Sequence, residues 1–269
     1  MRIAAHGVWL MSFVETGGAR IHYAIEGAEG APVLAFSNSL GANYSMWDPQ
    51  AQELRKTFRI LRYDTRGHGE SAVLPGPYSM EQLGKDALAL LDELHLGRVH
   101  FCGLSMGGMI GMWIGIHAPD RLNKLVLCNT GAKIGTEESW RSRIEAVQKG
   151  GMKSIAAGVI ERWFTPAFRA KEPATVARIQ KIVEGTNPEG YTSCCAAIRD
   201  YDCREHLERI GAPTLVITGA HDPATPAADG RFIAAHIRGG KYLELDAAHL
   251  SNIEDGARLT RELTAFLNL

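Results

Sequence analysis

The chain has 269 residues, 45% hydrophobic and 22% charged, a balance typical of a globular protein with a core of ordinary size. This composition excludes a disordered chain, a coiled coil and a collagen. The 29 basic and 30 acidic side chains nearly cancel, so no overall charge attracts nucleic acid or an acidic membrane. Any recognition of a charged ligand must therefore be local.

The chain carries no clear targeting or membrane signal. No apolar run reaches the ~18 to 20 residues that a membrane span requires. Gly7–Val14 has the hydrophobicity of a signal peptide, but it lacks an Ala-x-Ala cleavage site and runs into a strand-like segment. Met11 offers a second start, so Met1–Leu10 is a candidate upstream extension without a structural role. The sequence leaves both starts open.

The cysteines indicate reduced thiols in a cytoplasmic protein. They are odd in number and form no Cys-x-x-Cys pair, which favours neither a disulfide framework nor a zinc site. The five positions are Cys102, Cys128, Cys194, Cys195 and Cys203.

Short apolar or β-branched runs alternate with helical patterns, starting near residue 20. Seven runs predict strands: Arg20–Glu26, Val33–Ser37, Arg59–Tyr63, Val99–Cys102, Lys124–Cys128, Thr214–Thr218 and Lys241–Leu245. Met80–Leu94 has apolar residues at helical spacing, with Ser79 as its N-cap. Met106–His117 and Ala257–Leu267 predict helices in the same way. The alternation predicts an α/β fold, with a mostly parallel sheet covered by helices.

The alternation is interrupted in the middle of the chain. From about residue 135 to 202 only helical periodicity remains. Three prolines divide it: Pro166, Pro173 and Pro188. We interpret residues 133–205 as a helical cap inserted into a core formed by 1–132 and 206–269. The interrupted strands flank the candidate catalytic residues, so a lid over a site is favoured over peripheral padding.

A candidate nucleophile lies between a predicted strand and a predicted helix. Gly103-Leu104-Ser105-Met106-Gly107 matches G-x-S-x-G, directly after Val99–Cys102 and at the start of a helix. Small residues allow the sharp turn that would expose the Ser105 hydroxyl at the carboxyl end of the sheet. The alternatives are a glycine-rich packing turn or, less favoured, a nucleotide loop, for which no Gly-Lys-Ser/Thr follows.

A serine nucleophile requires a base, and the base requires an orienting acid. His249 follows the last predicted strand, at the same sheet edge as Ser105. Asp222 follows the preceding strand and is the favoured acid, which gives the chain order serine, acid, histidine. Asp246 is the alternative acid, but it lies only three residues from His249. His221 is interpreted as a bystander.

Acyl transfer also needs two N–H donors for the developing oxyanion. Met106, directly after the nucleophile, is predicted to be the first. The loop Asn38-Ser39-Leu40-Gly41 follows a predicted strand and is expected to supply the second, with Leu40 preferred. The turn Tyr63–Gly69 is interpreted as scaffold, and a catalytic role for His68 within it is the less favoured reading.

These motifs resemble those of the α/β-hydrolase family, over essentially the whole chain from Phe13 onward. Four segments resemble the enol-lactonases of that family: Ser37–Gly41, Met46–Gln50, Phe101–Gly108 and Cys194–Asp200. The family's common loop reads His-Gly where this chain has Asn38-Ser39, a departure that points toward the enol-lactonases and leaves the second oxyanion donor open.

The resemblance implies a serine hydrolase that opens the lactone ring of 3-oxoadipate enol-lactone in aromatic catabolism, through an acyl-enzyme on Ser105. It implies no metal and no organic cofactor. Another carboxylesterase, a perhydrolase or a C–C bond hydrolase remains an alternative. A lactone-sensing binding protein is a rival of a different class, distinguished by its lack of turnover.

An anionic lactone would need a local cation, because a net charge of -1 attracts no anion. The insert supplies cations around aromatic residues: Arg141, Arg143, Arg162 and Lys171 near Trp140, Trp163 and Phe164. The predicted substrate-binding residues are Trp140, Trp163, Arg141, Asn38 and Ser39. The alternative is that the tryptophans only pack and the arginines form a solvated face. The predicted partner is this small molecule, not nucleic acid or a membrane, and self-association is left open.

Overall fold

The computed structural model describes residues 10–16 and 18–268 and contains an eight-stranded sheet in the order β1-β2-β4-β3-β5-β6-β7-β8. The strands are β1 Leu10–Thr16, β2 Ala19–Glu26, β3 Val33–Ser37, β4 Arg59–Tyr63, β5 Val99–Leu104, β6 Leu122–Cys128, β7 Thr214–Gly219 and β8 Lys241–Leu245. β2 pairs antiparallel with β1 and β4, and all other pairs are parallel. The predicted α/β class is confirmed.

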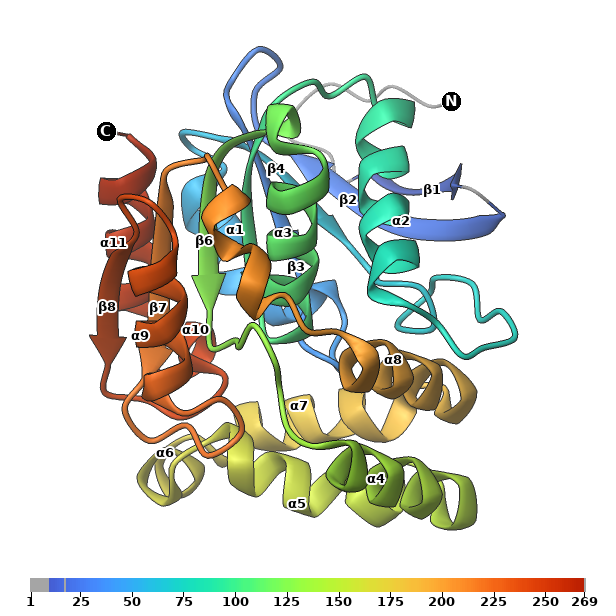
Figure 1. The fold of residues 1–269 in the computed structure, drawn as a ribbon. Helices are drawn as coiled ribbons and strands as arrows, with labels where there is room; N and C mark the ends of the chain where they lie inside the picture. Colours follow the sequence, from blue (N-terminus) through green and yellow to red (C-terminus); the bar gives the residue numbers. More distant parts are fainter. Residues whose placement is uncertain (1–9, 17, 269) are drawn as a thin grey trace.

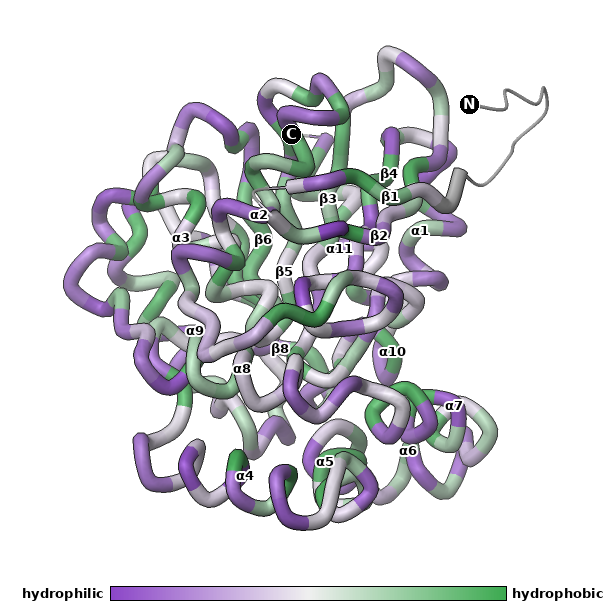
Figure 2. Tube along the Cα trace, turned by 90° about the vertical axis from the view of Figure 1, so that its right-hand side faces the viewer, coloured by the Kyte–Doolittle hydropathy of each residue, from purple (hydrophilic) through white to green (hydrophobic). Residues whose placement is uncertain are grey.

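Helices cover both faces of the sheet (Figure 1). One layer consists of α2 (Met80–Glu93), α3 (Met106–His117) and α9 (Ala227–His236). The other consists of α1 (Asp48–Leu54), α11 (Gly256–Leu267) and the short α10 (Ser251–Glu254). Figure 2 shows the predominantly hydrophobic strands between these two layers. Short 3-10 turns are η1 Tyr44–Trp47, η2 Pro119–Arg121 and η3 Arg204–Arg209.

Five further helices lie together at the carboxyl end of the parallel strands (Figure 1). These cap helices are α4 Glu137–Gly150, α5 Lys153–Trp163, α6 Pro166–Lys171, α7 Pro173–Gly185 and α8 Pro188–Asp200. Each of the three dividing prolines is the first residue of a helix, where its missing N–H costs nothing. The chain therefore builds the cap from separate short helices that can pack around a space.

The centre of the sheet explains where the candidate nucleophile lies. All six residues of β5 are buried, as expected for a strand covered on both faces. The following helix α3 is buried from Met106 to Ile116, where it packs against β5, β6 and the neighbouring helix α2. A strand and a helix fixed in this way hold the turn between them rigidly at the sheet edge.

The N-terminal interpretation needs a correction. Residues 1–9 lie outside the described residues, but Leu10 belongs to β1 and pairs with Ile25, so the extension proposed as Met1–Leu10 overlaps an edge strand. None of the seven predicted ranges includes β1, whose Phe13 is 45% exposed. Helices α1 and α9 were also not predicted, because α1 is only seven residues long and α9 contains Gly230.

Candidate active site

The turn between β5 and α3 forces Ser105 into an uncommon backbone conformation, with φ 57° and ψ -116°. Neighbouring glycines make that turn possible. A Cβ on Gly103 would lie 2.0 Å from the Gly107 carbonyl oxygen, and a Cβ on Gly107 would lie 2.3 Å from the Ser37 carbonyl oxygen. The strained residue faces the cap, as a nucleophile on this kind of turn requires.

Asp222 and His249, the predicted acid and base, contact each other directly. The loops after β7 and β8 bring them together, and His249 Nδ1 lies 2.8 Å from Asp222 Oδ2 with both side chains buried. Asp246 instead lies 2.7 Å from His221 Nε2 on the exposed surface. The geometry thus favours Asp222 over Asp246 and leaves Nε2 of His249 available to a substrate or to Ser105.

The Asp222 carboxylate accepts a full set of hydrogen bonds. Its Oδ1 accepts from the amides of Ala224 (2.8 Å) and Thr225 (3.1 Å). Its Oδ2 accepts from Asn129 Nδ2 (3.0 Å) and Thr225 Oγ1 (2.7 Å), in addition to His249. Burial alone would raise the pKa of Asp222, but the charge on His249 and these hydrogen bonds lower it to about 2. Asp222 is therefore ionised at neutral pH.

Two amides are available as oxyanion donors. Within residues 10–16 and 18–268, neither the Leu40 N–H nor the Met106 N–H donates to a protein atom. Their neighbours are occupied: Gly41 N–H donates to His68 Nε2 (2.9 Å), and Gly107 N–H donates to the Asn38 carbonyl (3.0 Å). The bonded neighbours fix the loop and helix start that carry the two free amides.

His68 binds the loop 38–41 and does not line the cavity. Burial lowers its pKa to about 4, and its ring nitrogens contact Gly41 N–H and, at 3.3 Å, the Arg66 carbonyl. This fits a neutral ring with the proton on Nδ1, donating to the carbonyl while Nε2 accepts. The scaffold interpretation of this turn agrees with that arrangement.

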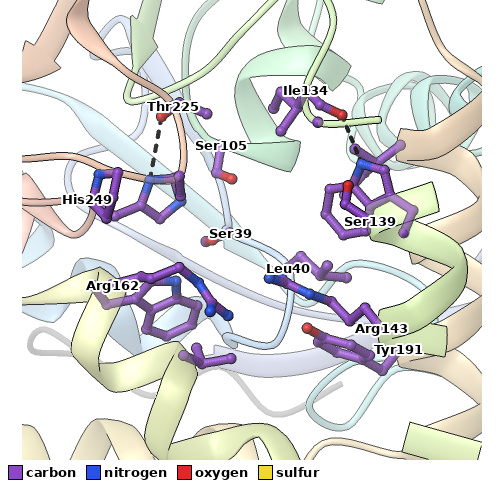
Figure 3. Close-up of a pocket in the computed structure, with 17 residues that line it drawn as sticks. Ser39, Leu40, Ser105, Ile134, Ser139, Arg143, Arg162, Tyr191, Thr225 and His249 are labelled. Carbon is purple, nitrogen blue, oxygen red and sulfur yellow. Dashed lines mark hydrogen bonds between the residues drawn. The ribbon is translucent and has the colours of Figure 1, made fainter. Parts of the chain in front are cut away.

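A cavity of about 190 Å³ lies between these residues and the cap (Figure 3). It is smaller than the ~300–1,000 Å³ clefts that hold drug-sized ligands. Ser39, Leu40, Ser105 and His249 line its core side. Trp140 and Trp163 line the cap side. The Trp140 indole N–H donates to the Ile134 carbonyl (2.7 Å), and the ring centroids of Trp163 and His249 lie 6.4 Å apart.

Two arginines enter the same cavity from the cap. Arg143 of α4 and Arg162 of α5 reach toward its centre from opposite sides, and Tyr191 of α8 lies beside Arg143 (Figure 3). Neither guanidinium pairs with a carboxylate among the described residues. Burial and the charge of Arg143 lower the pKa of Arg162. Two convergent cations without a counter-ion form an environment that an anion would stabilise.

Comparison with known proteins gives consistent results. Residues 32–150 match the α/β hydrolase fold family. The chain is 44% identical to 3-oxoadipate enol-lactonase 2 of Acinetobacter baylyi, covering 87% of this chain and 88% of that one. The chain belongs to the α/β-hydrolase family. It is also 38% identical to 3-oxoadipate enol-lactonase 1 of that organism, over 93% and 94% of the two chains. The structure of the enol-lactonase from Burkholderia xenovorans matches with a TM-score of 0.95 and 44% identity, over 96% and 100% of the chains.

Two substrate-binding predictions for this α/β-hydrolase need correction. Arg141 points to solvent, 63% exposed, and pairs with Glu137 one helical turn away. The Asn38 side chain is buried, its amide donates to the Tyr63 carbonyl (2.7 Å), and it does not line the cavity. Ser39, Trp140 and Trp163 do line it.

Several residues of the α/β-hydrolase site were not predicted from the sequence. Thr225 and Asn129 hydrogen-bond to Asp222, and Tyr191 lines the cavity beside Arg143 (Figure 3). Asn129 directly follows β6, in a left-handed conformation with φ 43°, and a polar residue at a strand end was a usable signal. Tyr191 lies inside a helical pattern, so sequence periodicity alone could not separate it from core.

We also searched this α/β-hydrolase for disulfides, metal-ligating clusters and membrane-spanning helices. All five cysteines are buried and unpaired. No cluster of three or more potential metal-ligating side chains occurs among residues 10–16 and 18–268. In the same part of the chain, no helix has the length and apolar character needed to cross a bilayer.

Proposed function

We propose that this α/β-hydrolase opens the ring of 3-oxoadipate enol-lactone and releases 3-oxoadipate. One observation carries the proposal: a small cavity places Ser105 and the His249–Asp222 pair opposite two arginines that pair with no carboxylate in the described part of the chain. That arrangement suits an ester-like carbonyl joined by a short arm to a carboxylate. The relatives named as 3-oxoadipate enol-lactonases, at 44% and 38% identity, support this choice of substrate.

The first half of the reaction forms an acyl-enzyme. Ser105 Oγ attacks the lactone carbonyl while His249 Nε2 takes its proton. Asp222, bonded to Nδ1, keeps the imidazole in the tautomer that can accept at Nε2 and stabilises the imidazolium. The amides of Leu40 and Met106 receive the oxyanion. When the tetrahedral species collapses, the ring C–O bond breaks and the enolate oxygen leaves.

The second half of the reaction uses the same groups in reverse. His249 gives its proton to the enolate, which later becomes the ketone. It then removes a proton from water, whose oxygen attacks the acyl carbon and releases the carboxylate product and the Ser105 hydroxyl. Every proton passes through one imidazole, so no metal or organic cofactor enters this scheme.

The arginines set the substrate class. Because Arg143 stacks on Trp140, with its guanidinium carbon 5.1 Å from the ring centroid, that cation is held in place before a ligand arrives. Arg162 approaches from the other side, so the substrate carboxylate would lie between two charges. Its binding would remove the repulsion between them and orient the lactone carbonyl toward Ser105.

The proposal is tested by comparing kcat/KM for the enol-lactone, its methyl ester and p-nitrophenyl acetate. We expect the anionic lactone to exceed its neutral methyl ester by about 10-fold or more, because only the anion uses the two arginines. Turnover of the anionic lactone no faster than that of the neutral esters would contradict the proposed substrate.

Arg143→Ala and Arg162→Ala test the anion site itself. Each should lower kcat/KM for the enol-lactone by about 10-fold or more, with little effect on p-nitrophenyl acetate, because the neutral ester has no carboxylate to lose. Arg141→Ala is the matched control on the same helix, since Arg141 faces solvent. If Arg141→Ala lost as much lactonase activity as Arg143→Ala, the assignment of the anion site would be wrong.

A further inference from the structure

The backbone around His249 is bonded on both sides of the histidine. The preceding amide, Ala248 N–H, donates to Glu254 Oε2 at 2.9 Å. The following amide, Leu250 N–H, donates to the Trp163 carbonyl at 3.0 Å. Leu250 therefore takes its partner from the cap, whereas the strand β8 that leads into this loop ends at Leu245. The position of His249 depends on contacts outside the sheet.

The Glu254 carboxylate links the loop that carries His249 to the cap. Its oxygens also accept from the Thr165 amide, at 3.2 and 3.3 Å, and Oε1 accepts from the Thr165 hydroxyl. Thr165 is the N-cap of α6, and its hydroxyl oxygen accepts from the Phe168 amide at 3.2 Å. One carboxylate at the end of α10 thus joins the histidine loop to the start of a cap helix.

The cap segment held by Glu254 also contacts the imidazole. Trp163 lies two residues before Thr165, and its ring lies over the His249 ring with an interplanar angle of 30°. The segments 163–165 and 248–250 therefore run beside each other, joined through one backbone bond and the Glu254 carboxylate. A change at Glu254 would therefore act on the backbone that carries His249.

We infer that Glu254 is a positioning residue for the catalytic base. Through the Glu254 carboxylate, the cap helps to hold His249 in position. The inference rests on the proposed function, because it assumes that His249 is the base. Without the carboxylate, the Ala248 amide loses its acceptor and the loop gains freedom. A misplacement of the imidazole by about 1 Å can cost roughly 100-fold in rate, so the effect should appear in kcat.

The test is Glu254→Ala, assayed on the enol-lactone and on p-nitrophenyl acetate. We expect kcat to fall by about 10- to 100-fold on both substrates, with KM within about twofold of wild type. The downfield proton resonance of the His249–Asp222 hydrogen bond should broaden or shift. Glu254→Gln keeps one carbonyl acceptor of nearly the same shape, so it should recover part of kcat and also tests the inference if the alanine variant folds poorly.

Asp255→Ala is the matched control. Asp255 is the next residue along the chain and makes no side-chain cap hydrogen bond to α11, so its removal should leave kcat and the resonance unchanged. Wild-type kcat in both Glu254 variants would overturn the inference, as would an unchanged resonance in a folded, slow Glu254→Ala enzyme. Failure of the wild-type enzyme on the lactone alone would instead contradict the proposed substrate, since the p-nitrophenyl acetate assay reports on the base independently.

Discussion

Individual residues in this site act through a few short contacts. Asp222 is anchored by Asn129 and Thr225, and Asn129 Oδ1 in turn accepts from Ser251 Oγ at 2.5 Å. His68 plays a similar part on the opposite side, because it holds Gly41 and so leaves the Leu40 amide free. These supporting side chains are buried, and their effect on the reaction is to fix orientation.

His68 gives a pH prediction. Its pKa of about 4 in the folded protein lies below the ordinary value near 6.5, so the unfolded chain binds more protons between these values. Stability from this residue is therefore complete above pH 6.5 and falls as the pH drops toward 4, by roughly 3 kcal/mol in total. His68→Gln keeps an acceptor for Gly41 N–H but does not titrate. Its Tm should fall less than the wild-type Tm between pH 6.5 and 4, and equal slopes would contradict this role.

Helices and strands differ in how far their sequence determined them. The strands on the inside of the sheet were predicted because each is a short, nearly continuous apolar run. Arg141 and Arg143 show what the sequence pattern of a helix cannot decide. They lie about 200° apart around α4, so only the true rotation of that helix decides which one enters the cavity. Trp140 and Arg143 share a face at a spacing of three, a signal that the prediction of Trp140 together with Arg141 overlooked.

The contact of α8 with the core gives a prediction at the scale of one element. Gly190 near the start of α8 packs directly on Gly67, and a Cβ there would lie 2.2 Å from the Gly67 carbonyl oxygen. Gly190→Ala should push α8 away from the loop that carries His68, and lower both Tm and kcat. Gly185→Ala is the control, because beyond its chain neighbours and its own helix backbone no atom of the described residues lies within 4 Å of its Cβ position. Equal Tm values for the two variants would show that α8 can shift without loss of stability and would contradict this prediction.

At the scale of the whole molecule, the fold brings together side chains that lie far apart in the sequence. The position of Ser105, Asp222 and His249 at one edge of the sheet could be predicted because each follows a strand, and parallel strands end at the same edge. The contacts between cap and core could not be predicted, because they depend on how the cap helices pack against the loops of the core. Glu254 and Thr165 are 89 residues apart and have no joint signal in the sequence.

The central claim is that Ser105 opens the enol-lactone with His249 as its base. The most direct measurement is kcat for 3-oxoadipate enol-lactone in purified wild-type, Ser105→Ala and Asp222→Asn enzymes, each checked for an unchanged fold. We predict that Ser105→Ala abolishes turnover and that Asp222→Asn lowers kcat by up to roughly 10⁴-fold, because the imidazole loses its orienting partner. A Ser105→Ala enzyme that opened the lactone at the wild-type rate would contradict the mechanism.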